Sequence, residues 1–247
     1  MPRRLPWVNK LPSHLGDGVI TVGLALVAVH LLVFVGFFVV RNPGFAAFYW
    51  NDLAVSAEAV LEGRVWTVGT YGLVHDPDSL WHLLGNVFAL YVFGPPLEAR
   101  WGKRRWLQLF GLAVLAGGLA VVIAGLVGFP SVTVGASAGT MALLAAWSWT
   151  FPQSTVMLMF FLPVAGRHLL PMVLGIDALM ALSGSDVSWP AHAGGVLAAW
   201  LQLGGRQRLQ AAWVARKVAR EKAARLEQAR RRFKVIDGGK VDEHDIN

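Results

Sequence analysis

Apolar residues in this chain are gathered into long uninterrupted runs. Gly18–Val40 contains 23 residues without Asp, Glu, Lys or Arg, and Trp106–Val127 contains 22 more. A bilayer core of roughly 30 Å is crossed by about 20 helical residues, each rising about 1.5 Å. Both runs are therefore long enough to be membrane-spanning helices. The first is longer than the apolar part of a signal peptide, so we expect it to be retained.

Four shorter runs lie between breaker residues, and they bring the number of candidate helices to six. They are Leu80–Leu97, Gly135–Phe151, Leu169–Leu182 and Ala191–Leu203. The last two are short for independent spans and are also compatible with buried or re-entrant helices. The pattern predicts an all-α fold: a polytopic membrane protein whose six-helix bundle occupies residues 18–204.

The distribution of basic residues predicts the orientation of this bundle. With six spans, both termini lie on one side, and that side holds 20 of the 22 Lys and Arg residues. Only Arg41 and Arg64 fall on the other side, in the long connection over residues 41–79. Because basic residues collect in cytoplasmic segments, we expect residues 1–17 and 205–247 to be cytoplasmic. The long outer loop is rich in aromatic residues, and either has its own structure or is an ordinary connection.

Composition agrees with a membrane protein and limits the partners. Only 15% of the residues are charged, against about 25% in soluble domains. The net charge of +7 comes mostly from the tail after Gly204, which has 12 basic and 6 acidic residues, so it does not indicate nucleic-acid binding. The tail is predicted to be helical over Arg206–Lys234, either as a solvated helix or in contact with anionic lipid headgroups. No cysteine is present, so disulfides are excluded.

Polar residues with catalytic chemistry stand at the start of three predicted helices, at the outer end of each. His82 and Asn86 lie four residues apart in one helix, Ser137 opens another within Gly-Ala-Ser-Ala-Gly, and His192 opens a third. Asp76–Ser79 and Ser188 precede two of these helices and are suited to capping them. We therefore expect the four polar residues to meet at one depth, just below the outer surface.

These residue types suit acyl transfer. A serine hydroxyl becomes a nucleophile when a base such as imidazole takes its proton. An amide, a second imidazole and the free N–H groups of a helix start can stabilise the oxyanion that forms. Small residues, among them Gly135, Gly139 and Gly195, allow the helices of Ser137 and His192 to approach closely enough for a hydrogen bond.

The ordered combination of motifs resembles the rhomboid family of intramembrane serine proteases. The matching segments are Gly135–Gly139, Ala191–Gly195 and His82–Asn86, together with His75 and the Gly94, Glu98, Gly102 spacing. The resemblance covers about residues 61–203. It implies that Ser137 is the nucleophile and His192 the general base. It also implies an oxyanion site made by His82, Asn86 and the Ser137 amide.

The resemblance implies a catalytic pair without a third carboxylate, and no acid near His192 in the sequence obviously fits that role. Asp177 is read as a hydrogen-bonded cap or gate residue, and Glu98 as a structural anchor for the Arg100–Arg105 turn. His75, Gly135, Gly139 and Gly195 are expected to give structural support. No cofactor or metal is expected.

Two other classes of function compete with a serine protease. A metal-dependent protein using His75, His82 and His192 lacks the His-Glu-x-x-His motif and a carboxylate-rich ligand cluster. A catalytically inactive rhomboid-like factor that binds or sorts membrane proteins remains the alternative, although such relatives typically lack the serine or the histidine. The expected substrates are transmembrane proteins, and the expected location is a bacterial inner (cell) membrane.

Overall fold

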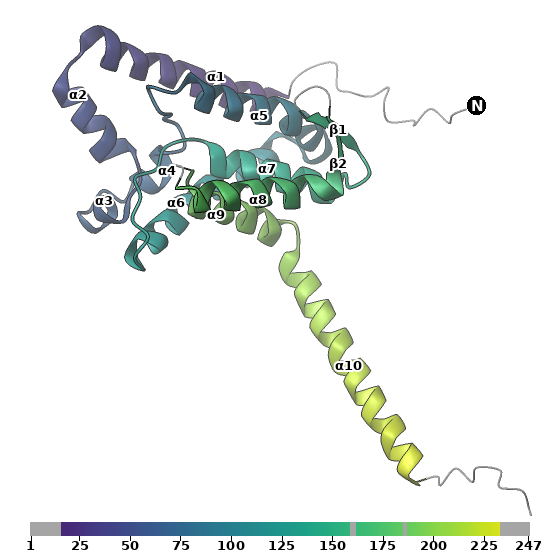
Figure 1. The fold of residues 1–247 in the computed structure, drawn as a ribbon. Helices are drawn as coiled ribbons and strands as arrows, with labels where there is room; N and C mark the ends of the chain where they lie inside the picture. Colours follow the sequence, from purple (N-terminus) through teal and green to yellow (C-terminus); the bar gives the residue numbers. More distant parts are fainter. Residues whose placement is uncertain (1–15, 159–161, 185–186, 233–247) are drawn as a thin grey trace, which may run out of the picture. The chain divides into compact units, whose positions relative to one another are not determined.

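The computed structural model describes residues 16–158, 162–184 and 187–232. The chain forms two compact units, Met1–Leu203 and Gly204–Asn247. In the second unit, helix α10 spans Gly205–Arg232 (Figure 1), which confirms a helix in the tail. Of the predicted cytoplasmic segments, residues 1–15 and 233–247 lie outside the described residues.

All six predicted helices are present in the first unit, with ends that differ by a few residues. They are α1 (Asp17–Phe34, continued as a π-helix over Val35–Val40), α5 (Leu80–Trp101), α6 (Lys103–Leu126), α7 (Ser137–Thr150), α8 (Gly166–Leu182) and α9 (Trp189–Gln202). Within the described residues, three helical segments are long and apolar enough to cross a membrane: Asp17–Val40, Leu80–Trp101 and Lys103–Leu126. The chain is thus a mostly helical membrane protein, and the number of six spans stays a prediction.

A short β-hairpin departs from the predicted all-α fold. Strands β1 (Thr155–Leu158) and β2 (Leu162–Ala165) pair antiparallel, with Thr155 opposite Ala165. The strands are rich in β-branched and other apolar residues, and Pro163 lies at an edge where its missing N–H is tolerated. The hairpin joins α7 to α8 (Figure 1), and its base is closed by the Gly166 N–H donating to the carbonyl of Ser154 at 2.8 Å.

The connection between α1 and α5 has a structure of its own. It contains α2 (Pro43–Phe48), a π-helical turn (Tyr49–Leu53), α3 (Ala57–Leu61) and α4 (Thr67–Thr70). Asn42 and Ser56 cap α2 and α3 by accepting hydrogen bonds from Gly44 N and Ala59 N, which satisfies free N–H groups at these helix starts. Of the two readings of this loop, the structured one is correct.

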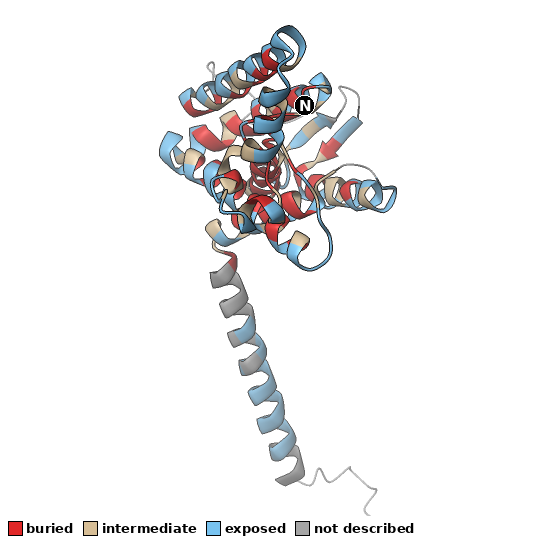
Figure 2. Ribbon diagram, turned by 90° about the vertical axis from the view of Figure 1, so that its left-hand side faces the viewer, coloured by how far each residue is buried: buried red, intermediate tan, exposed pale blue. Residues whose placement is uncertain are grey.

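Helices α6, α7 and α9 form the centre of the first unit. Every residue of α7 from Ala138 to Ser148 is buried, and Figure 2 shows the buried residues gathered in the interior of the helical body. The three helices touch through glycines. A Cβ on Gly117 of α6 would lie 2.4 Å from the Ala138 side chain, and one on Gly194 of α9 would lie 2.5 Å from the Ala116 carbonyl. Small residues therefore bring the helix backbones into contact, as expected for membrane helices.

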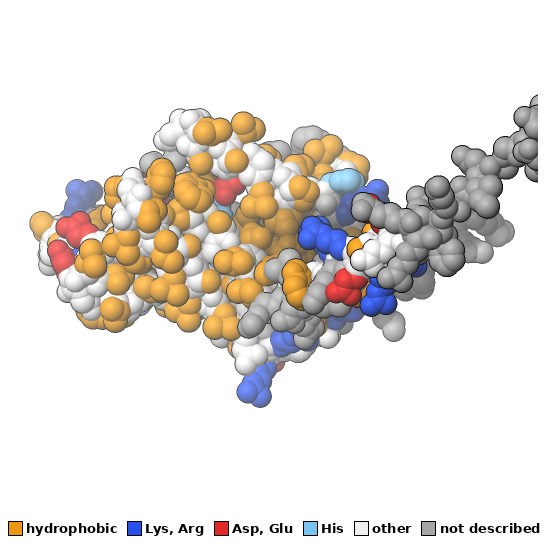
Figure 3. Space-filling view, turned by 90° about the horizontal axis from the view of Figure 1, so that it is seen from below, with side chains coloured by type: hydrophobic (Ala, Val, Ile, Leu, Met, Phe, Trp, Pro, Cys, Tyr) orange, Lys and Arg blue, Asp and Glu red, His pale blue; other side chains and the backbone are white. Residues whose placement is uncertain are grey.

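The surface of the first unit is mostly apolar between two charged ends. Figure 3 shows orange apolar side chains over most of the face, with charged side chains gathered at the end that α2 and α3 form in Figure 1 and at the opposite end. Leu24 and Leu32 on α1 are 66% and 70% exposed, and Leu119 and Ile123 on α6 are also exposed. Exposed apolar area of this extent is typical of a lipid-facing surface.

Glu98 has a different partner from the one expected. Glu98 is only 6% exposed, and its carboxylate accepts hydrogen bonds from Gly18 N at 2.9 Å and Val19 N at 3.0 Å, so it caps the start of α1. The contact of Glu98 with the Arg100–Arg105 turn is made by its backbone and not by its side chain: the Glu98 carbonyl accepts a hydrogen bond from Gly102 N at 2.7 Å. The negative charge also lies at the positive end of the α1 dipole. Glu98 therefore joins the start of α1 to the last turns of α5.

We predict that Glu98→Ala lowers the free energy of unfolding by about 2–3 kcal/mol, because two buried N–H groups lose a charged acceptor. Glu98→Gln keeps one oxygen acceptor and should cost about 1 kcal/mol. Tryptophan fluorescence during thermal unfolding in detergent measures both. Glu58→Gln, on the exposed surface of α3, is the matched control. Equal unfolding temperatures for the Glu98 and Glu58 variants would contradict this role.

Candidate active site

The start of α7 presents Ser137 together with free backbone N–H groups. Gly135 has φ of +115°, a conformation that side-chain-bearing residues rarely adopt, and Ala136 is the N-cap. Ser137 is the first helical residue, and the first hydrogen bond inside the helix start runs from Thr140 N to the Ala136 carbonyl. The N–H groups of the preceding residues therefore have no partner within the helix. Such a helix start favours negative charge beside Ser137.

His75 holds the segment that leads into α7. Its Nε2 accepts a hydrogen bond from Ala136 N at 3.3 Å, and its carbonyl accepts one from the Tyr49 hydroxyl at 2.8 Å. The His75 side chain is fully buried. Burial, together with the smaller effects of the nearby His82 and His30, lowers the pKa of His75 to about 3. A neutral imidazole is what the Ala136 N–H requires as an acceptor.

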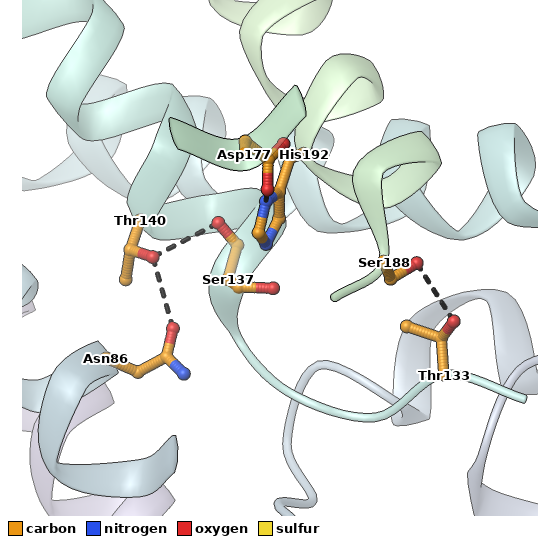
Figure 4. Close-up of polar contacts among 7 residues, drawn as sticks. All are labelled: Asn86, Thr133, Ser137, Thr140, Asp177, Ser188 and His192. Atoms are coloured by element: carbon orange, nitrogen blue, oxygen red, sulfur yellow. Dashed lines mark hydrogen bonds and ion pairs between the residues drawn. The ribbon is translucent and has the colours of Figure 1, made fainter. Parts of the chain in front are cut away.

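Asn86 is fixed in place by two contacts. Its Nδ2 donates to the His82 carbonyl at 2.8 Å, and its Oδ1 lies 3.1 Å from the Thr140 hydroxyl. Since a backbone carbonyl can only accept, these contacts determine which end of the amide is the donor. Thr140 is also 3.1 Å from the Ser137 carbonyl, so it connects the predicted oxyanion donor to the helix of the predicted nucleophile (Figure 4). Thr140 was not predicted from the sequence, although its position about one turn after Ser137 was a visible signal.

His82 lies against the same segment. Its ring centroid is 5.2 Å from that of His75. A Cβ on Gly135 would come within 2.5 Å of His82 Nε2, so the glycine leaves the space that this ring occupies. The structure thus brings His82 against the segment that leads into Ser137, and the predicted shared depth in the membrane stays a prediction. Gly139, predicted as structural support, makes room for Phe110 of α6, which a Cβ would approach to 2.5 Å.

Ser137 and His192 face each other across the contact between α7 and α9. Near both residues the backbones meet: a Cβ on Gly195, about one turn after His192, would lie 2.1 Å from the carbonyl oxygen of Ala138, the residue that follows Ser137. Figure 4 shows the Ser137 side chain beside the imidazole of His192. Both residues are partly exposed. No hydrogen bond between these two described side chains is drawn in Figure 4, so the predicted direct bond stays a prediction.

His192 has a carboxylate partner that the sequence analysis did not assign to it. Asp177 Oδ1, from the middle of α8, lies 2.8 Å from His192 Nδ1. The expectation that no acid fits beside His192 is therefore wrong. The two residues are 15 positions apart in the chain, and only the packing of α8 and α9 brings them together. Asp177 is thus hydrogen-bonded to His192, and its predicted role as a cap or gate residue stays a prediction.

The predicted capping side chains have other partners. The Ser188 hydroxyl accepts from Thr133 Oγ1 at 3.0 Å, and Asp76 Oδ1 accepts from Asp78 N at 2.9 Å in the turn before α5. Ser188 and Ser79 are the N-cap residues of α9 and α5, and neither makes a side-chain cap hydrogen bond. The bond from Thr133 to Ser188 instead ties the segment before α7 to the start of α9.

The combined geometry suits nucleophilic chemistry on a carbonyl group. A hydroxyl, an imidazole with a carboxylate behind it, an oriented amide and free helix N–H groups lie around one point at the end of the helical body. Acyl transfer requires a nucleophile, a base and oxyanion donors. Within the residues that the structure describes, no group of three or more His, Asp or Glu side chains is arranged to hold a metal ion.

We predict that His75 makes the folded state sensitive to acid. The unfolded chain binds a proton at this imidazole below about pH 6.5, whereas the folded protein excludes it down to about pH 3. Stability from this residue is therefore present above pH 6.5 and is lost as the pH falls through that window, by up to about 1.4 kcal/mol per pH unit. His75→Gln keeps an acceptor for Ala136 N and should show a shallower decline. Parallel pH profiles of the unfolding temperature for the two proteins would refute this prediction.

Comparisons with known proteins point to one family. A family model described as the Rhomboid domain matches residues 62–204. The chain is 28% identical over 180 residues to "RHOMBOID-like protein 12, mitochondrial" of Arabidopsis thaliana, an alignment that covers 66% of this chain and 53% of the relative. It thus spans about half the length of this plant relative.

A second similar protein comes from Bacillus subtilis (strain 168) and is described as "Putative rhomboid protease YdcA". It is 26% identical over 187 residues, covering 74% of this chain and 85% of the relative. The family match includes every helix that builds the site, from α5 to α9. Since it extends over more than half of the chain, this protein belongs to the rhomboid family.

Proposed function

We propose that this protein is an intramembrane serine endopeptidase that hydrolyses peptide bonds in or near transmembrane helices. The observation that supports this most directly is the position of Ser137. It starts a buried helix, has free N–H groups around it, and faces His192 across a glycine-mediated backbone contact. A serine with only a packing role would not need this set of neighbours. Membership of the rhomboid family is consistent with the proposal.

In this proposal Ser137 is the nucleophile and His192 the general base. The Ser137 proton passes to His192 while Oγ bonds to the substrate carbonyl carbon, and the carbonyl oxygen becomes an oxyanion. The Ser137 N–H, the Asn86 amide and His82 surround the position where this oxyanion forms. His192 then protonates the leaving amine, and water releases the acyl group from Ser137. His75, Gly135 and Gly195 support this geometry through the contacts described above.

The proposal includes an arrangement in the membrane. The six helices cross the bilayer with both termini cytoplasmic, since 20 of 22 basic residues lie on that side. Ser137 is then near the outer surface, where water is available for hydrolysis. Backbone carbonyls of an intact substrate helix are hydrogen-bonded, so helices that unwind easily near their outer end are the preferred substrates. The tail contacts anionic headgroups, and the membrane is a bacterial cell membrane.

An inactive rhomboid-like protein that binds membrane proteins is the alternative function. Such a protein would have the same fold, the same location in a membrane and the same class of partner as a protease. It would not need a reactive serine, because binding alone requires no nucleophile. Reaction of Ser137 with a fluorophosphonate probe, which needs a nucleophilic hydroxyl, distinguishes the two without knowledge of the natural substrate.

We predict that Ser137→Ala and His192→Ala each abolish cleavage of a single-span reporter protein by the purified enzyme, with a loss of at least about 10³-fold in kcat. Ser148→Ala and His168→Ala are the matched controls. Ser148 lies in the same helix with its buried hydroxyl unpartnered, and His168 is exposed. Both controls should cleave normally. Cleavage that persists in either active-site variant would refute the proposed mechanism.

We predict that Thr140→Val lowers kcat by about 10-fold with little change in KM. Loss of the hydroxyl frees Asn86 to rotate, so that its amide donor is no longer held toward the reacting carbonyl. Thr140→Ser restores the hydroxyl and should keep most of the activity. Steady-state kinetics on the reporter separate the two parameters. Equal kcat for the Val and Ser variants would exclude this positioning role.

A further inference from the structure

The contact between Asp177 and His192 is a carboxylate–imidazole pair inside the helical body. Asp177 Oδ1 is 2.8 Å from His192 Nδ1, and the side chains are only 10% and 15% exposed. A carboxylate within a membrane helix is costly unless it has a partner, and such residues commonly mark functional sites. Here the described partner is the imidazole proposed as the general base.

The geometry of the ring makes this pair relevant to the reaction. An imidazole has two nitrogens, and in its neutral form one donates while the other accepts. Asp177 meets Nδ1, and Figure 4 shows Ser137 on the side of the ring away from Asp177. A carboxylate accepts a hydrogen bond only, so the proton of the neutral ring is held on Nδ1. Nε2 is then left with the lone pair that a general base needs toward the Ser137 hydroxyl.

The geometry points to Asp177 as the positioning residue of a Ser137–His192–Asp177 arrangement, in which its carboxylate fixes the tautomer and orientation of the base. This inference rests on the proposed protease function. During acylation the Ser137 proton moves to His192 Nε2, the Oγ electron pair forms the new C–O bond, and the carbonyl π electrons move to oxygen. The C–N bond then breaks, and the same proton passes from Nε2 to the leaving nitrogen. The proton on Nδ1 stays between His192 and Asp177 throughout.

A purely structural cross-link between α8 and α9 is the competing explanation. It predicts that any disruption of the pair lowers stability and activity together. A positioning role predicts something different, because Asp177→Asn nearly conserves size and hydrogen bonding yet removes the negative charge. The amide can also donate to the ring, which favours the tautomer with its proton on Nε2 and removes the lone pair facing Ser137.

The first test measures the tautomer and needs no activity. Nitrogen NMR of the purified full-length protein, labelled with ¹⁵N-histidine, is recorded in detergent at alkaline pH, and His192→Gln identifies the signals of His192 among the seven histidines. In the wild type we expect the neutral ring to carry its proton on Nδ1. In Asp177→Asn a substantial fraction should shift to Nε2. A wild-type ring protonated on Nε2 would overturn the inference.

The second test measures kinetics on the single-span reporter. Asp177→Asn should lower kcat by about 10²- to 10⁴-fold, with KM changed by less than about twofold and the unfolding temperature nearly kept. Asp177→Glu should recover part of the activity, since it restores the carboxylate. Asp78→Asn, the same exchange at an exposed position before α5, is the control and should behave as the wild type.

The outcomes separate this inference from the proposed function. If Ser137→Ala still cleaves the reporter, the proposed mechanism fails, and the NMR result alone decides whether Asp177 sets the tautomer of His192. If the wild type depends on Ser137 but Asp177→Asn keeps wild-type kcat, the inference on Asp177 is overturned and the protease function stands. Loss of kcat in proportion to loss of folded protein, with an unchanged tautomer, would also overturn it.

Discussion

The packing of the helices around the candidate active site depends on direct contact between the backbones of α6, α7 and α9. Gly117, Gly194 and Gly195 occupy positions where any side chain would collide with a neighbouring helix. Lipid tails are as apolar as the helix surfaces, so helices in a bilayer gain little from hiding apolar area and associate through close packing instead. This contact sets the separation of Ser137 on α7 and His192 on α9. The proposed chemistry therefore depends on residues without functional groups.

A second constraint is that buried polar groups in an apolar layer need partners. The structure pairs Asn86 with Thr140, His75 with Ala136 N and Asp177 with His192. Unpaired, each would carry a desolvation cost of about 1–3 kcal/mol or more. Here the pairs also orient the groups proposed to react, so stability and preorganisation come from the same contacts. Glu98 shows the purely structural case at the opposite end of α5, where it caps α1.

The sequence predicted the helices well because long apolar runs have few other solutions in a bilayer. It also placed His82, Ser137 and His192 near the starts of three helices, α5, α7 and α9, and in the structure α7 packs against the other two. The β-hairpin after α7 was missed, since a short apolar segment near a proline does not distinguish a strand from an interfacial loop. The predicted side-chain capping by Asp76–Ser79 and by Ser188 was wrong. Asp76 bonds within its own turn and Ser188 bonds to Thr133, and local hydrogen-bonding ability does not reveal which partner is taken.

By itself the sequence determined the mostly helical membrane fold, the family, and the positions along the chain that carry reactive side chains. Those properties follow from the length and periodicity of apolar runs and from the order of short motifs. Both can be read from residues that are close together in the sequence. Only the tertiary structure decided which side chains are neighbours. Asp177 beside His192, Thr140 on Asn86 and Glu98 at the start of α1 each join separate helices. Their pairing is set by how helices rotate and approach when packed, which no local pattern encodes.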